Sequence, residues 1–285
     1  MPAGKYAFFR KVVSLSFFGY LLCSIFLYFL QELLIFPVLT AQLFGVSFVQ
    51  APPPHISIAE VRTPDGETLQ GWTTFNRATF PNPHHVGVIF HGNAETIHAG
   101  NFLPMFLDQG VPAYTFDYRG YGSSTGWPSE QRLKEDAVAI WNHIQSETGL
   151  APDRAIILGN SLGTGIASHL ARSITPKALI LIAPYASIPH VVRGRIAYRP
   201  FQWLLRYNLS VLDDVASLRS GEIIIAHGKS DNVIPFENFS LLTEQLHRNK
   251  HVKVTPLVGE TAGHDDIYYE VEGKLKEKLR EAISR

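Results

Sequence analysis

Short apolar runs alternate with longer amphipathic segments along most of the chain, from residue 55 to the end. Six of the runs are almost entirely apolar, as expected for strands that are buried on both faces of a parallel sheet. They cover residues 86–90, 112–116, 155–158, 178–182, 222–226 and 252–257. The segments 129–147 and 236–248 between them carry apolar residues at helical spacing. This alternation indicates βαβ units, and it predicts an α/β fold whose mostly parallel sheet has helices on both faces.

Two further strands are predicted ahead of the parallel sheet. Residues 56–63 and 69–75 are joined across Pro64-Asp65-Gly66, which is a turn signal between two strand-like runs. Later in the chain, the connection 183–221 is longer than the others and is rich in aromatic residues and arginine. We expect residues 55–285 to form one large domain, with a small cap made by residues 184–219.

The N-terminal part of the chain differs in kind from the rest. Residues 12–31 carry no charged side chain, and twenty helical residues span about 30 Å, the thickness of a bilayer core. Lys5, Arg10 and Lys11 precede this run, and the next Lys or Arg is Arg62. By the positive-inside rule, the pattern predicts a single-pass membrane anchor with a cytoplasmic N-terminus and an extracytoplasmic domain, lumenal or periplasmic.

Two alternatives to a membrane anchor are a cleaved signal peptide and a buried helix of a soluble protein. The apolar run is longer than the usual core of a signal peptide, and it shows no clear small-x-small cleavage site. The uncharged residues 33–50 are expected to lie at the lipid interface, and the prolines of 51–54 form a stiff spacer. Residues 1–54 are therefore interpreted as anchor and spacer.

Composition excludes several classes of function. The chain has 25 basic and 25 acidic residues, so it has no electrostatic footprint for nucleic acid. It contains one cysteine, Cys23, so it can form neither an internal disulfide nor a cysteine metal cluster. The four histidines between residues 84 and 98 match no zinc-binding spacing. We expect no metal and no cofactor, and the oligomeric state stays open.

The stretch AIILGNSLGTG, residues 155–165, is the most informative motif. An apolar strand leads into Gly159-Asn160-Ser161-Leu162-Gly163 and then into a helix of small residues, which is the context of a nucleophile elbow. In that strained turn the residues two before and two after the serine crowd each other, and Gly159 and Gly163 relieve the crowding. The alternative is an ordinary glycine-rich turn in which the serine caps a helix. The elbow predicts Ser161 as a nucleophile at a helix N-terminus.

A serine nucleophile needs a base and an acid that orients the base, and in this architecture the acid precedes the histidine in the chain. Asp231 and His264 each lie in a loop that follows a predicted strand, and both loops reach the edge of the sheet where Ser161 lies. Asp213, Asp214 and Asp265 are rival acids. We assign the acid to Asp231, because it alone follows a strand end between the serine and the histidine.

A third strand end contributes to the same site. The run 86–90 leads into His91-Gly92-Asn93. In enzymes with a nucleophile elbow, this loop supplies one backbone N–H group to the oxyanion hole, and the residue after the serine supplies the other. The two predicted donors are the backbone N–H groups of Asn93 and Leu162. Asp117, Arg119 and Tyr121 are expected to brace the neighbouring loops.

Five motifs in this order resemble those of the α/β-hydrolase-domain serine hydrolases. They read FHGNAE, FDYRGYGSSTG, LGNSLG, HGKSDNVIP and GHDD, and the resemblance covers about residues 56–283. The chain is most similar to the membrane-anchored branch, with lysophospholipase-like, monoacylglycerol-lipase-like and acyl-protein-thioesterase-like members. It departs from the commoner patterns in having Asn160 before the serine, and it lacks the N-terminal cysteine cluster of the palmitoylated cytosolic thioesterases.

These observations predict a serine hydrolase that cleaves a carboxylic ester or thioester through an acyl-enzyme. The anchor favours a lipid-derived substrate, and the cap is expected to contribute aromatic residues to an acyl channel and arginines for lipid head groups. Two alternatives stay open at this point. One is an acyltransferase that uses the same three residues, with an alcohol in place of water, and the other is a catalytically silent binding module tethered to a membrane.

Overall fold

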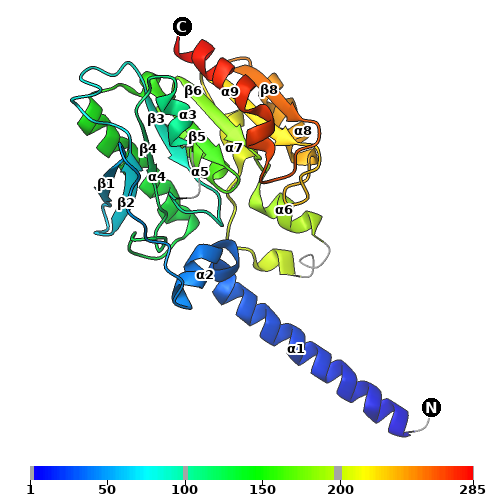
Figure 1. Cartoon of the computed structure of the whole chain (residues 1–285). Helices are drawn as coiled ribbons and strands as arrows, with labels where there is room; N and C mark the ends of the chain where they lie inside the picture. The colour runs from blue at the N-terminus through cyan, green and yellow to red at the C-terminus, as the bar shows by residue number, and fades with distance from the viewer. Residues whose placement is uncertain (1–2, 99–101, 196–200, 285) are drawn as a thin grey trace.

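The structure is a computed structural model that describes residues 3–98, 102–195 and 201–284. Part of the predicted cap, residues 196–200, lies outside these ranges. A long helix, α1, projects from a rounded α/β domain in which helices lie on both sides of one sheet (Figure 1). The fold class predicted from the alternation of strands and helices is confirmed.

Eight strands form one sheet in the order β1-β2-β4-β3-β5-β6-β7-β8. The strands are β1 (Ser57–Arg62), β2 (Thr68–Thr73), β3 (Val86–Phe90), β4 (Ala113–Phe116), β5 (Ala155–Asn160), β6 (Ala178–Ile182), β7 (Glu222–Gly228) and β8 (Lys253–Gly259). β2 pairs antiparallel with β1 and with β4, and every other pairing is parallel. The carboxyl ends of β3, β5, β7 and β8 therefore meet at one edge, which is where ligands bind in open parallel sheets.

Helices cover both faces of this sheet (Figure 1). The helices of the described residues are α1 (Ala3–Ile35), α2 (Pro37–Leu43), α3 (Leu103–Leu107), α4 (Glu130–Thr148), α5 (Gly163–Ile174), α6 (Ile188–Gly194), α7 (Val211–Ala216), α8 (Glu237–Arg248) and α9 (Ile267–Ile283), with a 3-10 turn at Pro152–Arg154. The ends of α4 follow from its sequence: the Ser129 side chain accepts a hydrogen bond from Arg132 N–H, and Gly149 takes the left-handed conformation that ends the helix.

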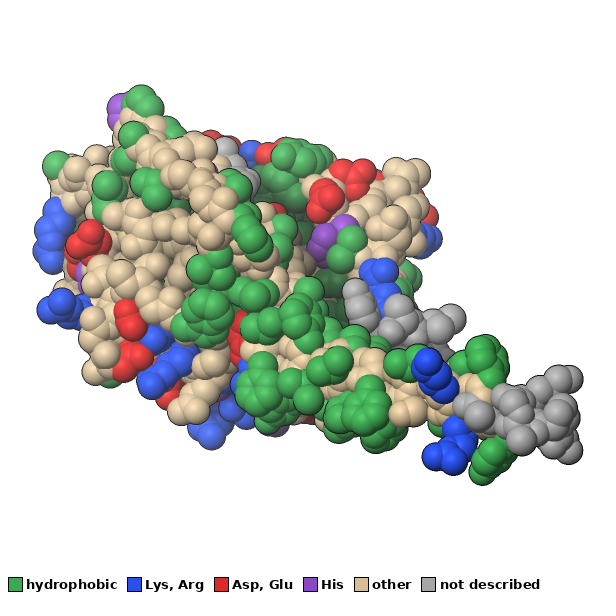
Figure 2. Space-filling view, turned by 90° about the horizontal axis from the view of Figure 1, so that it is seen from below, with side chains coloured by type: hydrophobic (Ala, Val, Ile, Leu, Met, Phe, Trp, Pro, Cys, Tyr) green, Lys and Arg blue, Asp and Glu red, His purple; other side chains and the backbone are tan. Residues whose placement is uncertain are grey.

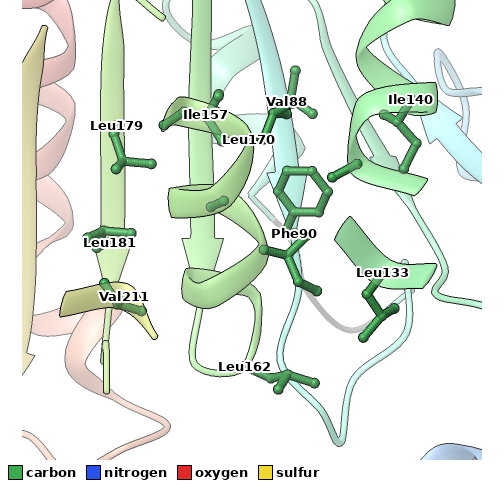
Figure 3. Close-up of a cluster of buried hydrophobic side chains, with 14 of the residues drawn as sticks. Val88, Phe90, Leu133, Ile140, Ile157, Leu162, Leu170, Leu179, Leu181 and Val211 are labelled. Carbon is green, nitrogen blue, oxygen red and sulfur yellow. The ribbon is translucent and has the colours of Figure 1, made fainter. Parts of the chain in front are cut away.

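Two buried apolar clusters lie on the two faces of the sheet. One lies between the sheet and α4, α5, α7 and α8, and Figure 3 shows side chains of β3, β5 and β6, including Val88, Ile157 and Leu179, on the side where α5 carries Leu170. The other lies under α3 and α9. Five of the six apolar runs that predicted the parallel strands are thus buried on both faces. The sixth run, residues 252–257, forms the edge strand β8 and is only partly buried, with Lys253 and Pro256 exposed, because no further strand covers it.

The helix α1 is largely uncovered by protein. It contains the stretch Phe8–Ile35, in which a window of 18 residues has a mean hydropathy of 2.0, and this is, within the described residues, the one helical stretch long and apolar enough to cross a membrane. Its apolar side chains are exposed, as Figure 2 shows from below the domain; Phe8, for example, is 71% exposed. This exposure is compatible with a membrane span or with a signal sequence, and it is not compatible with a helix buried inside this domain.

The residues that follow α1 pack into the domain. Phe36 is fully buried against the rings of Tyr121 and Tyr207, and Val38 and Leu39 of α2 belong to the same core cluster. The segment 33–50, which the sequence analysis placed at the lipid interface, therefore contributes to the protein core through its first part. Its last part is mostly exposed, with Phe44 at 85% exposure, although Phe48 is partly buried against the same cluster.

Candidate active site

Ser161 lies in the tight turn between β5 and α5. Its φ of 50° is in the left-handed region, which a residue other than glycine occupies only when the surrounding fold imposes it. A Cβ atom on Gly159 would lie 2.6 Å from the carbonyl oxygen of Gly163, and one on Gly163 would lie 2.1 Å from the carbonyl oxygen of Phe90. The two glycines thus allow a turn that no larger residue could form, and the second also makes room for the end of β3.

The three residues predicted as a triad lie in one line of hydrogen bonds. His264 Nε2 is 2.9 Å from Ser161 Oγ, and His264 Nδ1 is 2.7 Å from Asp231 Oδ2. Asp231 is buried, whereas the His264 side chain is 12% exposed and reaches solvent beside the serine. These distances match those of a nucleophile, a base and the acid that orients the base.

Backbone groups hold Asp231 in its orientation. Its Oδ1 atom accepts hydrogen bonds from the N–H groups of Val233 at 2.8 Å and Ile234 at 2.7 Å, which leaves Oδ2 facing His264. Burial raises the pKa of this carboxyl group, but hydrogen bonds from His227, His264 and Ile234 outweigh it and hold the pKa well below its usual value. The carboxylate is therefore negatively charged at neutral pH.

His227 is a site residue that the sequence analysis missed. Its side chain is fully buried, its Nε2 atom lies 2.8 Å from the carbonyl oxygen of Ile234, and the same atom lies 3.4 Å from Asp231 Oδ2. The His227 side chain thus links the start of the loop that carries Asp231 to Ile234 at the end of that loop. Its position at the end of a predicted strand, four residues before the acid, was the signal that could have revealed it.

The two predicted oxyanion donors lie beside Ser161. Leu162 precedes α5 directly, and Asn93 lies in the loop after β3, on the wall of the cavity that contains Ser161. Within the part of the chain that the structure describes, neither backbone N–H donates a hydrogen bond. Their role as oxyanion donors stays a prediction.

The loop that carries Asn93 is held from two sides. The Tyr121 hydroxyl donates to the carbonyl oxygen of Asn93 at 2.7 Å, and the Asn93 side-chain amide donates to the carbonyl oxygen of Ile35 at 3.2 Å. Asp117 accepts a hydrogen bond from Ile97 N–H at 2.9 Å, further along the same loop. The end of α1 is therefore connected directly to the loop beside the nucleophile.

Glu95 is a second residue that the sequence analysis missed. One carboxylate oxygen accepts a hydrogen bond from Gly92 N–H at 2.7 Å, and the carboxylate also accepts from the Asn160 side chain at 3.1 and 3.2 Å. Asn160, the residue that departs from the commoner elbow sequences, thus has a partner. The Glu95–Asn160 bridge connects the loop of one expected oxyanion donor to the turn that carries the other.

The rival acids occupy other places. Asp214 is buried and pairs with Arg172 at 3.2 Å, Asp213 is exposed at the start of α7, and Asp265 is exposed on the cavity rim.

No group of three or more potential ligands that could hold a metal ion occurs among the residues that the structure describes. Arg119, one of the predicted bracing residues, binds Asp65 at 2.7 Å and Asp136 at 2.6 Å.

A cavity of about 620 Å³ opens above Ser161 and His264. This volume lies in the range of small-molecule sites. Its apolar wall comes from the segment around α3 and from the first turn of α9, including Phe102, Met105 and Tyr268. Within the described residues, the cap 184–219 contributes nothing to this wall, so Phe201, Trp203 and the other described cap aromatics do not form the expected acyl channel. Tyr198, which also belongs to the expected channel, lies outside the described residues.

Comparisons with known proteins identify the family of the chain. Residues 81–222 match the family described as serine aminopeptidase, S33. The chain is 31% identical over 209 residues to alpha/beta hydrolase domain-containing protein 17B of Xenopus tropicalis, which covers 72% of this chain and 68% of the relative. The human protein of that name is 30% identical over the same coverage, and an uncharacterized protein of Mycobacterium tuberculosis is 32% identical over 70% of each chain.

Solved structures have the same fold. An esterase from Pyrococcus furiosus superposes with a TM-score of 0.67 at 18% identity, over 84% of this chain and 96% of the esterase. Est1E from Butyrivibrio proteoclasticus, solved with ferulic acid, gives a TM-score of 0.62 at 21% identity, over 80% of this chain and all of that chain. With its eight-stranded sheet and these relatives, the chain belongs to the α/β-hydrolase family of serine hydrolases and is an enzyme that acts on esters.

Proposed function

We propose that this chain is a membrane-anchored serine hydrolase that cleaves a lipid-derived carboxylic ester or thioester through an acyl-enzyme. The observation that carries the proposal is the line of hydrogen bonds from Asp231 through His264 to Ser161, next to a cavity with an apolar wall. The hydrolytic unit in this proposal consists of residues 55–285 together with the buried part of 33–50, and residues before it form the anchor.

The first half of the reaction forms the acyl-enzyme. His264 Nε2 takes the proton of the Ser161 hydroxyl as Oγ attacks the carbonyl carbon of the ester. Asp231 keeps the Nδ1 proton on the imidazole and stabilises the imidazolium that forms. The negative charge on the carbonyl oxygen is met by the N–H groups of Asn93 and Leu162, and loss of one such donor typically costs about 3 kcal/mol. His264 then returns the proton to the departing alcohol or thiol, and the acyl group stays on Ser161.

The second half restores the enzyme. A water molecule gives a proton to His264 Nε2 and attacks the acyl carbon, and the same two N–H groups bind the second oxyanion. Ser161 Oγ leaves, takes back its proton from His264, and the carboxylic acid is released. The open cavity mouth, where the His264 side chain is partly exposed, supports direct entry of water.

Two features support a lipid-derived substrate. Aromatic and aliphatic side chains such as Phe102, Met105 and Tyr268 border the cavity, so a hydrocarbon chain would lose water on binding there. The helix α1 presents the exposed apolar surface of a membrane span, which would hold the site beside lipid.

The nucleophile is tested by Ser161→Ala in the full chain. We expect the variant to lose labelling by a fluorophosphonate probe and to lose hydrolysis of p-nitrophenyl esters and lysolipids, while its melting temperature does not fall. The acyl-chain preference of the unaltered enzyme is measured on the same panel. Labelling that persists in Ser161→Ala would show that another residue is the nucleophile.

The topology is tested separately. We expect the N-terminus in the cytoplasm and the hydrolytic domain outside it, because Lys5, Arg10 and Lys11 precede the apolar run. A C-terminal tag should be protected from protease in sealed vesicles whose cytoplasmic side faces outward. Digestion of the tag in these vesicles would place the domain in the cytoplasm, and release of the chain by carbonate would argue against a membrane span.

A further inference from the structure

We infer that the described end of the cap, residues 201–205, is a second membrane contact that inserts into a phospholipid bilayer beside α1. This inference rests on the proposed anchor and goes beyond it, because it assigns a lipid-binding surface to a part of the domain far along the chain from α1. The surface consists of Phe201, Trp203, Leu204 and Leu205, and it is called the cap turn below.

The cap turn contacts α1 far from the point where α1 joins the domain. The rings of Phe201 and Tyr20 are stacked with their centroids 5.3 Å apart, and Trp203 Nε1 donates to the Tyr20 hydroxyl at 3.3 Å. Between the cap turn and α1 lies an apolar cavity of about 210 Å³, whose lining includes Leu27 and Leu34. Trp203 is 67% exposed although it belongs to this apolar surface.

The level of Tyr20 determines where the cap turn lies relative to a bilayer. About twenty helical residues cross the hydrocarbon core, and the apolar stretch of α1 is Phe8–Ile35. The first window of twenty residues in that stretch ends at Leu27, and later windows end closer to the domain. Leu27 is seven residues beyond Tyr20, which is about 10 Å along a helix. In every window, Tyr20 and the ring stacked on it therefore lie below the domain-side surface of the hydrocarbon.

The polar groups of the cap turn are arranged for a water-poor environment. The Gln31 side chain donates to the carbonyl oxygen of Leu204 at 3.3 Å and accepts from Arg206 N–H at 2.8 Å, so backbone groups that would cost free energy in lipid are paired. The first charged groups on the domain side are Glu32 and Arg206, and they pair with each other. Tyr28, whose exposed ring lies 5.3 Å from the Arg206 guanidinium, stands next to this pair, and an exposed tyrosine beside paired charges is typical of a membrane–water boundary.

The other described part of the cap reaches the rim of the active-site cavity. Arg195, directly after α6, donates to the carbonyl oxygens of Asn232 and Val233, each at 3.0 Å. Val233 lines the cavity that contains Ser161, and its side chain is 43% exposed. The cap therefore contacts α1 at the bilayer level on one side and the cavity rim on the other, which would keep the cavity close to the lipid surface.

The test uses the full chain in phosphatidylcholine vesicles whose acyl chains carry bromine, which quenches tryptophan fluorescence on contact. The chain has four tryptophans. Trp72 and Trp141 are buried in the domain, while Trp127 and Trp203 are 50% and 67% exposed. We expect Trp203→Phe to remove most of the quenching and the matched control Trp127→Phe to leave most of it. Each sample is also floated after carbonate treatment, which measures the anchor independently.

Three outcomes are informative. Quenching that Trp203→Phe removes and Trp127→Phe retains, in chains that float, supports the inference. Chains that float and show the same quenching with or without Trp203 would overturn the membrane contact of the cap turn while the anchor stands. Chains that do not float after carbonate treatment would overturn the proposed anchor and the inference with it.

Discussion

The replacement Asp231→Asn tests the proposed role of the acid with little change in shape. In the unaltered chain, Asp231 Oδ1 accepts two backbone hydrogen bonds, from Val233 and Ile234, and Oδ2 faces His264. An asparagine at this position keeps its side-chain oxygen toward the N–H groups of Val233 and Ile234. The opposite orientation would place its NH₂ group against these two donors, with no hydrogen bond possible. The NH₂ group then faces His264 Nδ1 and forces this atom to accept a hydrogen bond.

The consequence is the wrong tautomer of the base. With Nδ1 as acceptor, the imidazole proton sits on Nε2, which lies 2.9 Å from Ser161 Oγ and can no longer take the serine proton. In other triads this exchange lowers kcat by about 10⁴, which corresponds to about 5 kcal/mol at 1.36 kcal/mol per factor of ten. We expect a loss of that order in kcat for a water-soluble ester, with KM little changed.

The assay compares Asp231→Asn with Asp265→Asn, whose carboxylate is exposed beside the same histidine. Asp265→Asn should lower kcat less than tenfold, and both variants should remain folded by circular dichroism. Because the pKa of Asp231 is held below its usual value, the acid stays ionised in the unaltered enzyme over the range of the assay. A nearly neutral Asp231→Asn together with a severe Asp265→Asn or Asp213→Asn would refute the assignment.

Three further predictions address the surroundings of the site. Glu95→Ala breaks the bridge to Asn160, and in steady-state kinetics it should lower kcat by roughly tenfold to a hundredfold because the oxyanion donors are misplaced. Glu95→Gln should recover most of the lost kcat. An equal loss of kcat in both variants would contradict a positioning role. Phe36→Ala should cost about 3–5 kcal/mol of unfolding free energy, measured in urea, against under about 0.5 kcal/mol for the exposed Phe44→Ala; similar values would mean that residues after α1 do not belong to the core. Burial lowers the pKa of His169 to about 4, so between pH 6.5 and 4 the unfolded chain binds more protons than the folded chain and the free energy of unfolding falls as the pH drops. In urea titrations at several pH values, His169→Gln should show a smaller fall of the unfolding free energy. An unchanged dependence of the unfolding free energy on pH would assign the effect to another group.

The strands and the order of the site residues could be predicted from the sequence, because both are local patterns. An apolar run such as residues 178–182 indicates a buried strand without reference to any other part of the chain, and β6 occupies those residues. The loops after β7 and β8 follow from the strand ends, and the structure brings Asp231 and His264 within hydrogen-bonding distance of each other and His264 to Ser161.

Contacts between distant segments could not be predicted in this way. Residues 33–50 have the composition of an interfacial segment, and only the folded structure shows Phe36 between Tyr121 and Tyr207. The bridge between Glu95 and Asn160 joins residues 65 positions apart, and neither side chain carries a signal for the other. The cap was expected to line the cavity because it is aromatic, yet Phe201 and Trp203, two of its described aromatic residues, contact α1 instead.

The hydrogen bond from the Asn93 side chain to Ile35 ties the last residue of α1 to the loop beside the nucleophile. With α1 in a bilayer, this tie fixes the height of Ser161 above the lipid. Such an enzyme meets its substrate by lateral diffusion in two dimensions. Its turnover then follows the mole fraction of ester within the membrane. Adding inert lipid to the vesicles slows the reaction, whereas diluting the same vesicles with buffer leaves the turnover of each enzyme molecule unchanged.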